Sequence, residues 1–474
     1  MKKILYILTA ILLFSCEDVL IEKPKSIAVE TFYNTSGEVE SAIAAIYVPI
    51  RGNNSFGAVY LAMQEAFSDF FVGRASFAPL SDYQGLNSTN ITRAGSAWND
   101  FYLSIRNANL IIKNVSNATK LNDDNKNKYI AEAKFLRALD YFYLVRNWGG
   151  VPLHTDQNMD VIEVPRSSVA EIYQLITNDL DFAQNNLPDK APIAGRPSKW
   201  AAKTVLADVY FYQGKNTEAG KLANEVIQSG KYSLVGVSTA NDFEKIFGAT
   251  VVSSTEEIFY LKFSQESSWN LPIYFNGVNT PYLGISGYMA IYGVTNNPLY
   301  TSWDDNDLRK TYGWYKWDFG LGANTILNKK FTDPGILTPR NDYPMYRYTD
   351  LLLLYAEASC LSANSPTADG MEKLNMVHRR AYGYNPMQAS PIDFKLTDYN
   401  KQSFTDLVIK ERGYETQAEG KRWLDLKRTG RVKEYIKAAK GKDVADIHLL
   451  WPIPVSEMSF NKGIDPSKDQ NPGY

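Results

Sequence analysis

Helical periodicity is the feature that most constrains the fold of this chain. Within 128–148, apolar residues recur at i, i+4, i+7 and i+10, the spacing of one helical face. The residues on this face are Phe135, Leu139, Phe142 and Val145. Two glycines and a proline follow and end the pattern. The segment therefore predicts a long helix with one buried face.

The same periodicity returns along much of the chain. It covers 168–187, 198–213, 217–229, 346–360, 370–381 and 403–428. The two segments around Gly214 have the spacing of large and small residues that is typical of a tetratricopeptide unit. These residues are Leu206, Ala207, Tyr210 and Ala219. A second unit is indicated at Ala356 and Ala368. Several such units would stack into a superhelix, whereas one alone fits a generic helix pair equally well.

Two stretches lack this periodicity. In 232–346, Gly, Pro, Asn and Tyr recur every few residues, and a shorter stretch of the same kind runs from Gly73 to Gly95. Loop-rich stretches of such length inside a compact domain are usually functional. The sequence therefore predicts a mostly α fold with long irregular, loop-rich insertions.

The charge balance argues against one class of partner. The chain has 50 Lys and Arg against 52 Asp and Glu residues, a formal net charge of -2. A protein that holds a polyanion presents a basic field, and the composition provides no basic excess. Nucleic acid is therefore not an expected partner.

The first residues resemble the signal of a bacterial lipoprotein. Two lysines precede an apolar run (4–14) that is too short to cross a bilayer as a helix. The run leads to a serine and Cys16, with a leucine three positions before the cysteine, as in a lipobox. We expect a lipoprotein signal peptide over 1–15, lipidation of Cys16 and a tether over 16–27. An ordinary signal peptide with a chance cysteine is the alternative. Cys360 is then left without a partner, and we expect it to be buried.

Several longer segments resemble one known family. They are 346–358 (YRYTDLLLLYAEA), 374–381 (LNMVHRRA), 411–426 (ERGYETQAEGKRWLDL) and 449–474, which begins LLWPIP and ends QNPGY. Their order, and their spread over nearly the full chain behind a lipobox, resemble the SusD/RagB family of nutrient-binding lipoproteins.

The resemblance implies a fold and a role. Members of the family are mostly α-helical lipoproteins built on a tetratricopeptide-like helical superhelix. They bind glycans or other nutrients at the surface of the outer membrane and cap a SusC-like TonB-dependent barrel. By this resemblance we expect 28–231 to be an N-terminal, tetratricopeptide-rich region. It would form one compact body with a RagB/SusD C-terminal region over 232–474.

Three glutamates are the candidates for catalysis. Glu411, Glu415 and Glu419 lie four apart and would share one helical face. The two carboxylates of a glycoside hydrolase instead flank a bond from across a cleft. We therefore expect a structural ion-pair network with basic residues nearby. These are Arg412, Lys421 and Arg422.

Metal binding has only one candidate segment. Asp304, Asp305 and Asp307 could donate oxygens to a structural calcium ion, but the glycine and the distal glutamate of a complete calcium loop are missing. A solvated loop is the preferred interpretation. The three histidines share no metal-ligand spacing, so no other cofactor is expected.

The aromatic residues favour a binding role, because the C–H face of a sugar ring packs on Tyr and Trp rings. Five tryptophans fall in helical or family-motif segments and are expected in the core: Trp98, Trp148, Trp200, Trp423 and Trp451. The predicted ligand site combines residues of both loop-rich stretches: Arg74, Tyr83, Asn87, Trp269, Tyr282, Trp303 and Trp314.

The family resemblance, together with the lipobox and the loop aromatics, implies a function. We expect a surface-exposed lipoprotein that captures an oligosaccharide or another nutrient and caps a SusC-like TonB-dependent transporter for import. We expect no catalysis by the chain itself. A helical scaffold that binds peptides and a helical glycoside hydrolase are the alternatives. The identity of the ligand is left open.

Overall fold

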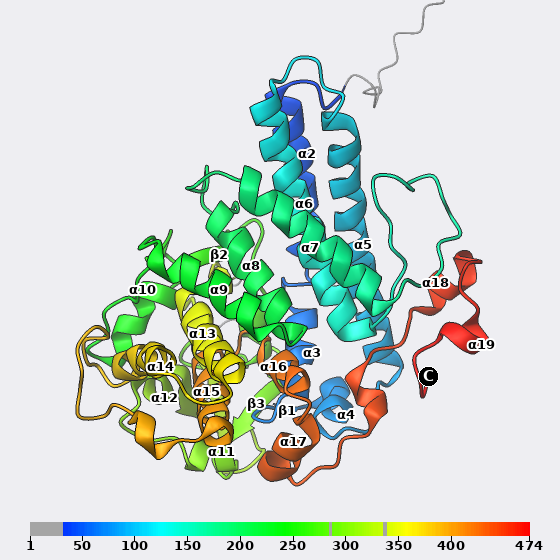
Figure 1. Ribbon diagram of the computed structural model, residues 1–474. Coiled ribbons are helices and arrows are strands. Elements are labelled where there is room, and N and C mark those ends of the chain that lie inside the picture. The colour runs from blue at the N-terminus through cyan, green and yellow to red at the C-terminus, as the bar shows by residue number, and fades with distance from the viewer. Residues whose placement is uncertain (1–31, 284–286, 335–338) are drawn as a thin grey trace, which may run out of the picture.

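The computed structural model describes residues 32–283, 287–334 and 339–474, and helices dominate it (Figure 1). The predicted signal peptide, Cys16 and the tether lie outside the described residues. The longer helices are α2 (Ser36–Ile50), α3 (Val59–Phe67), α5 (Ser88–Val115), α6 (Asp123–Trp148), α7 (Val169–Asn186), α8 (Lys199–Tyr212), α9 (Asn216–Gln228), α13 (Tyr348–Ala363), α14 (Ala368–Ala381), α15 (Lys401–Glu415), α16 (Arg422–Arg428) and α17 (Val432–Lys440). The shorter ones are α4 (Ala78–Ser81), α10 (Glu244–Phe247), α11 (Pro298–Thr301), α12 (Leu308–Gly313), α18 (Val455–Phe460) and α19 (Pro466–Asp469). The prediction of a mostly α fold is confirmed.

Successive helices pack side by side in a continuous stack. α5 packs on α6, α6 on α7, α7 on α8 and α8 on α9. The next helix in the stack is α13, which packs on α9 and is followed by α14. Residues 232–346 are therefore an insertion between two neighbouring helices of one array. This arrangement matches the expected tetratricopeptide-like architecture, and α8 with α9 is the helix pair predicted around Gly214.

Short strands that the sequence pattern did not predict lie in the insertion and, in the case of the first strand, at the start of the loop-rich stretch that contains Arg74. One antiparallel sheet has the order β1 (Val72–Gly73), β3 (Ile291–Val294), β5 (Thr325–Asn328) and β4 (Trp314–Lys316). A second sheet pairs β2 (Glu257–Leu261) with β6 (Tyr343–Arg347), which leads directly into α13. β5 and β6 are buried at every position, so their residues show no alternation of apolar and polar side chains.

Two predicted boundaries are wrong for local reasons. α5 starts at Ser88, inside a stretch predicted to be loop, because Asn87 caps it by accepting a hydrogen bond from the Asn90 backbone N–H. The helix predicted over 403–428 is broken between α15 and α16. Ala418 and Gly420 there have positive φ angles of 61° and 68°, and a Cβ on Gly420 would lie 2.5 Å from the Leu61 side chain.

Tryptophan rings from α5, α6 and the C-terminal segment meet in the core. The Trp148 ring centroid lies 5.5 Å from that of Trp98 and 5.0 Å from that of Trp451. Trp423 is buried as well, and Cys360 is buried as predicted. Trp200 is the exception: it is half-buried, and its Nε1 donates to Asp189 at the surface. Four of the five predicted core tryptophans are therefore confirmed.

A buried carboxyl on α6 yields a stability prediction. Asp140 is fully buried, and neither of its oxygens has a hydrogen-bond partner in the described part of the chain. Burial raises the pKa of Asp140 well above its usual value, and the nearby Ser104 hydroxyl, which is not placed for a regular hydrogen bond, offsets only part of this rise. The folded state therefore loses stability as the pH rises above about 3.9, the pKa of an unfolded aspartate. We expect Asp140→Asn to raise the free energy of unfolding by about 1–3 kcal/mol at pH 7.

Calorimetry at pH 7 and near pH 3 checks this expectation. The gain in melting temperature should disappear at the lower pH, where the wild-type carboxyl is protonated in both states. Asp179→Asn is the matched control, because Asp179 is equally buried but accepts from Arg137 and Lys134 at 2.7 Å each. This control should lower the melting temperature at pH 7. An equal gain for Asp140→Asn at both pH values would contradict the assignment.

Candidate functional site

The two loop-rich stretches meet in the first sheet. β1 pairs with β3 so that Val72 lies opposite Tyr292, and the Arg74 backbone N–H donates to the Ala290 carbonyl at 2.7 Å. Five side chains from these stretches lie around this junction, and we refer to them as the tyrosine face. They are Arg74, Arg93, Tyr274, Tyr288 and Tyr292.

Arg93 fixes the start of α5 to the loop that follows β1. Its Nη2 donates to Ser76 Oγ at 2.9 Å and its Nη1 donates to Asn90 Oδ1 at 2.8 Å. Asn90 Nδ2 in turn donates to the Ser76 carbonyl at 2.7 Å. The Arg93 guanidinium lies 4.1 Å from the centroid of the Phe77 ring, a cation–π contact. These contacts hold the loop that carries Arg74 in one conformation.

The rings form a continuous row from the loop to the surface. The Phe77 ring lies 5.8 Å from that of Tyr274, which lies 5.4 Å from that of Tyr288. Tyr288 ends the row with 64% of its surface exposed. Arg74 is exposed, and its guanidinium has no hydrogen bond or ion pair with any residue of the described ranges. The tyrosine face therefore offers flat rings beside an arginine that is free to donate.

A second group of rings continues along the same sheet. The Tyr282 and Tyr315 centroids are 4.6 Å apart, and Trp317 lies 6.3 Å beyond Tyr315. Lys329 Nζ lies 4.8 Å from the Tyr282 centroid. The Tyr315 hydroxyl donates to Asn276 Oδ1 at 2.7 Å, close to the bridge between Gly277 and Tyr288. Aromatic rings and basic side chains thus lie on both sides of the β-bridge between Gly277 and Tyr288.

The structure separates the predicted site residues into two groups. Three of them are exposed or half-buried: Arg74, Asn87 and Tyr282. Asn87 also caps α5. The other four are buried: Tyr83, Trp269, Trp303 and Trp314.

Protein atoms cover each of the four buried rings. The Tyr83 hydroxyl donates to the Phe67 carbonyl at 2.6 Å, and Trp269 Nε1 donates to the Phe56 carbonyl at 2.9 Å. Trp303 stacks on Tyr414 with centroids 4.2 Å apart, and Trp314 donates to Gln417. Trp269, Trp303 and Trp314 therefore pack the core of the insertion, and Tyr83 packs on Phe67 and Trp423 outside it. Of the rings around the junction of β1 and β3, Tyr288 is the most exposed.

The sequence reasoning missed Tyr288 and gave no role to Arg93. Both residues stand in stretches marked as loop-rich, but 31 tyrosines are distributed over the chain. Only the pairing of β1 with β3 brings Arg74 next to the segment that carries Tyr288. The sequence alone does not show which distant segments lie next to each other, and this information was needed to find the tyrosine face.

The three aspartates proposed for calcium have other partners. Asp307 caps α12 and accepts from Arg309, Asp305 pairs with Lys310, and Asp304 accepts from Asn306. The described ranges contain no group of three or more His, Cys, Asp or Glu side chains that could hold a metal ion. These contacts favour the preferred interpretation, a loop whose aspartates are engaged by neighbouring side chains and backbone.

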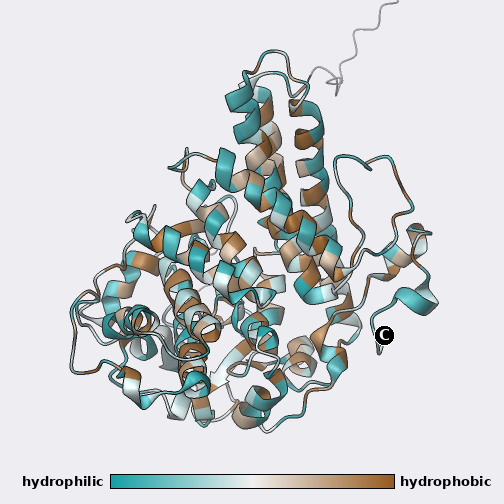
Figure 2. Cartoon of the chain, viewed as in Figure 1, coloured by the Kyte–Doolittle hydropathy of each residue, from teal (hydrophilic) through white to brown (hydrophobic). Residues whose placement is uncertain are grey.

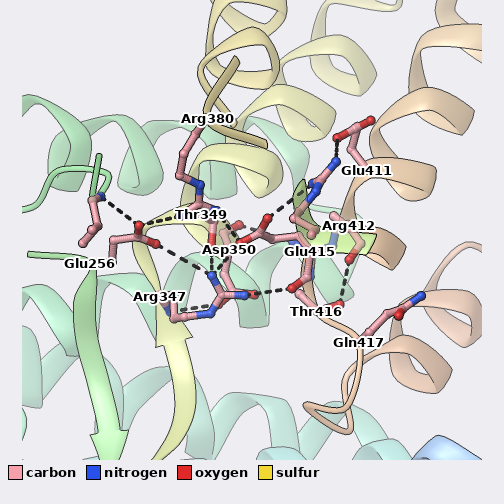
Figure 3. Close-up of polar contacts among 12 residues, drawn as sticks. Glu256, Arg347, Thr349, Asp350, Arg380, Glu411, Arg412, Glu415, Thr416 and Gln417 are labelled. Atoms are coloured by element: carbon pink, nitrogen blue, oxygen red, sulfur yellow. Dashed lines mark hydrogen bonds and ion pairs between the residues drawn. The ribbon is translucent and has the colours of Figure 1, made fainter. Parts of the chain in front are cut away.

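The three glutamates lie in a buried ion-pair network. Figure 3 shows Glu411 and Glu415 within it. Glu415 accepts from Arg380 at 2.5 Å, from Arg347 at 2.7 Å and from Arg309 at 3.3 Å. Burial alone would raise its pKa, but the surrounding arginines, Arg380 first, hold the pKa of Glu415 well below its usual value. An ionised carboxylate whose oxygens are fully engaged is not available as an acid or a base.

The neighbouring glutamates are engaged in the same way. Glu411 accepts from Arg309 at 2.9 Å, and Glu419 accepts from Lys330 at 2.5 Å and from Arg347 at 2.6 Å. Against the effect of burial, these cations lower the pKa of each glutamate to about 2. The predicted structural network is confirmed, although only one predicted partner, Lys421, belongs to it, at 2.8 Å from Glu419.

The other two predicted partners pair elsewhere. Arg412 donates to Asp425 at 3.0 Å, and Arg422 donates to Asp69 at 2.7 Å. The actual cations come from β6, α14 and the insertion, all distant in sequence from the glutamates. The network therefore ties the insertion to the helix stack.

A surface pocket lies on another part of the molecule. It has a volume of about 590 Å³ and lies between the end of α9, the extended segment after it and the loop after α14. Its lining includes Tyr232, Tyr348, Met376, Tyr384 and Met387. This lining has no arginine, in contrast to the tyrosine face.

Comparison with known proteins covers almost the whole chain. Residues 22–211 match a family model described as starch-binding and associating with the outer membrane, and residues 206–474 match the model of the SusD family. A SusD-like protein, P25, of Formosa agariphila is 24% identical over 99% of both chains.

Solved structures share the fold. A SusD homolog from Bacteroides thetaiotaomicron covers 94% of this chain and 98% of its own, with 23% identity and a TM-score of 0.80. A laminarin-binding SusD-like protein covers 93% of this chain and 100% of its own, with 24% identity and a TM-score of 0.73. No helix in the described ranges is both long and apolar enough to cross a membrane.

Proposed function

The chain belongs to the SusD family, and we propose that it binds an oligosaccharide on the tyrosine face and passes it to a SusC-like TonB-dependent barrel. The observation that carries the proposal is the exposed Arg74 side chain, which the pairing of β1 with β3 brings next to the segment that carries Tyr292 and Tyr288, the exposed end of the ring row. Rings of this kind pack on the C–H face of a pyranose, and guanidinium N–H groups donate to its hydroxyl oxygens. A similar solved protein is named for laminarin binding, which supports a glycan as the ligand class.

Affinity electrophoresis on a panel of polysaccharides tests the proposed ligand class. Gels that contain laminarin, starch or another neutral glycan should retard the wild-type protein for at least one member of the panel. Binding of unstructured peptides, with no retardation by any glycan, would support the peptide-scaffold alternative instead.

The same protein should leave the glycan intact. The engaged state of Glu411, Glu415 and Glu419 supports a binding role, because none of the three carboxylates is free to act as an acid or a base. Chromatography of the bound polysaccharide after long incubation should show unchanged chain length. Release of short products would favour the hydrolase alternative.

The proposal also includes a lipid anchor. We expect Cys16→Ser to move the protein from the outer-membrane fraction to the soluble fraction, because the acylated cysteine is the proposed attachment to the bilayer. Mass spectrometry of the wild-type protein should show a diacylglycerol on Cys16 at the mature N-terminus. An unmodified thiol, or a membrane fraction unchanged by the substitution, would contradict the anchor.

A further inference from the structure

The pocket of about 590 Å³ differs in its chemistry from the tyrosine face. It lies between the end of α9, the segment 232–238 and the loop 383–387. None of the described residues that line it has a charged side chain. At its rim, Tyr384 is 42% exposed and Met387 is 73% exposed. A lining of this kind favours an uncharged ligand that carries apolar groups.

One wall of the pocket is a stretch of backbone that is hydrogen-bonded along one side. Within 232–237 the chain forms no helix, turn or bend. The Ser233 N–H donates to the Thr255 carbonyl at 3.0 Å, and the Thr255 hydroxyl donates back to the Ser233 carbonyl at 2.9 Å. Two residues further on, the Val235 N–H donates to Glu256 Oε1 at 2.9 Å. Residues two apart therefore pair with the segment that leads into β2, as they do along one side of a strand.

The opposite side of the same stretch is unpaired. Leu234 and Gly236 line the pocket, and neither their N–H nor their C=O groups form a hydrogen bond with a described residue. In an extended chain the N–H and C=O of one residue point to one side, and those of the next residue point to the other. The free groups therefore point away from Thr255. Free N–H and C=O groups at this two-residue spacing are the edge to which an added strand pairs.

Tyr348 contributes a further polar group to the pocket. This residue follows β6 directly, lines the pocket and is 5% exposed. Its ring packs on that of Tyr232, with centroids 6.4 Å apart. No residue of the described ranges forms a hydrogen bond with its hydroxyl. Because buried hydroxyls usually have a partner, this one is suited to a polar group of a ligand.

Separate contacts hold the wall on the other side of the pocket. Arg379 Nη1 donates to the Pro386 carbonyl at 3.0 Å. The same guanidinium pairs with Glu372 at 2.7 Å and with Asp393 at 2.6 Å. The loop that carries Tyr384 and Met387 is therefore fixed to α14, and the two walls are in place without a ligand.

We infer that this pocket binds an extended, uncharged polypeptide segment, which adds a strand to the free edge of 232–237. Its backbone would pair with Leu234 and Gly236, and its alternate side chains would pack on Tyr384 and Met387. The regular two-residue spacing of the free groups favours a polypeptide over a glycan, whose hydroxyls have no such repeat. The inference goes beyond the proposed function and does not depend on it, because the pocket is separate from the tyrosine face.

Selection of a phage library of random heptapeptides on the purified full-length protein tests the inference. We expect enriched sequences without charged residues and with apolar residues at every second position. A synthetic copy of the most enriched peptide should bind the wild type in fluorescence anisotropy. Tyr384→Ala combined with Met387→Ser should weaken this binding by at least roughly tenfold.

The matched control replaces two exposed apolar side chains outside the pocket. Phe460→Ala combined with Ile162→Ser is suitable, because these residues are 79% and 78% exposed. This control should bind the peptide as the wild type does. Equal binding by the pocket variant and the wild type, or a library that yields no enriched sequence, would overturn the inference.

Methylation of the peptide backbone tests strand pairing itself. Methyl groups on every second nitrogen remove the donors from one edge of the peptide, and the alternative pattern removes them from the other edge. One pattern should weaken binding by at least roughly tenfold and the other should leave it unchanged, because only one edge faces 232–237. Equal effects of the two patterns would contradict strand addition. Displacement of the peptide by a neutral glycan would assign the pocket to sugars and also overturn the inference, whereas retardation in glycan gels tests the proposed function separately.

Discussion

Glu415→Gln is expected to lower the free energy of unfolding by about 3–5 kcal/mol, the usual cost of removing one partner from a buried ion pair. Arg347, Arg380 and Arg309 all donate to this carboxylate, and all three are buried. The neutral amide would leave their charges without a full counter-charge in a region closed to water. Urea unfolding followed by tryptophan fluorescence would measure the change.

At low pH, the free energy of unfolding of Glu415→Gln should approach that of the wild type. The folded pKa of Glu411 and of Glu419 is about 2, below the value of about 4.3 for an unfolded glutamate, and that of Glu415 is also lowered. The stability that these carboxylates contribute is complete above about pH 5 and is lost as the pH falls toward 2.

A partly exposed ion pair provides the control for Glu415. Glu372 accepts from Arg379 at 2.7 Å, but its side chain is 44% exposed. Glu372→Gln should lower the free energy of unfolding by less than about 1 kcal/mol, which is typical of solvent-exposed ion pairs. Equal costs for the two substitutions would show that the buried network does not hold the insertion to the helix stack.

The second large effect is expected on ligand affinity. Arg74→Ala combined with Tyr288→Ala should weaken glycan binding by about 2–4 kcal/mol, or roughly 30- to 1000-fold. One substitution removes a charge-assisted donor and the other removes the exposed end of the ring row. Neither residue is buried, so the melting temperature should stay unchanged. Titration calorimetry with the glycan selected by electrophoresis measures the loss.

The control for the tyrosine face substitutes an arginine and a tyrosine on other parts of the surface. Arg106 and Tyr384 are exposed on other surfaces, and Tyr384 lines the 590 Å³ pocket. Arg106→Ala combined with Tyr384→Ala should leave the affinity at the wild-type value. A loss in this control, with full affinity in the Arg74 and Tyr288 variant, would move the ligand to the pocket.

The sequence predicted the features that depend on local spacing. The pair of α8 and α9 follows from large and small residues within one stretch, and its buried Leu206, Ala207 and Ala219 confirm the pattern. Figure 2 colours each residue by its hydropathy, and most helices carry both apolar and polar residues along their length. Periodicity of this kind needs no knowledge of distant contacts.

Features that depend on distant segments could not be predicted in this way. Trp269 stands in irregular chain, but the Phe56 carbonyl, 213 residues away in sequence, accepts its N–H and the ring is buried. Arg422 stands beside the glutamates in sequence and pairs with Asp69, 353 residues away. The tyrosine face has the same origin, because the pairing of β1 with β3 brings Arg74 to its position. Side-chain burial in a long insertion is set by such contacts and not by local composition.

Hydrogen–deuterium exchange with and without a saturating glycan tests the location of the ligand most directly. Binding on the tyrosine face predicts slower exchange of backbone amides in 72–77 and 287–294, with no change in 232–238 and 383–387 around the 590 Å³ pocket. Slower exchange confined to those pocket segments, with none at β1 and β3, would contradict it.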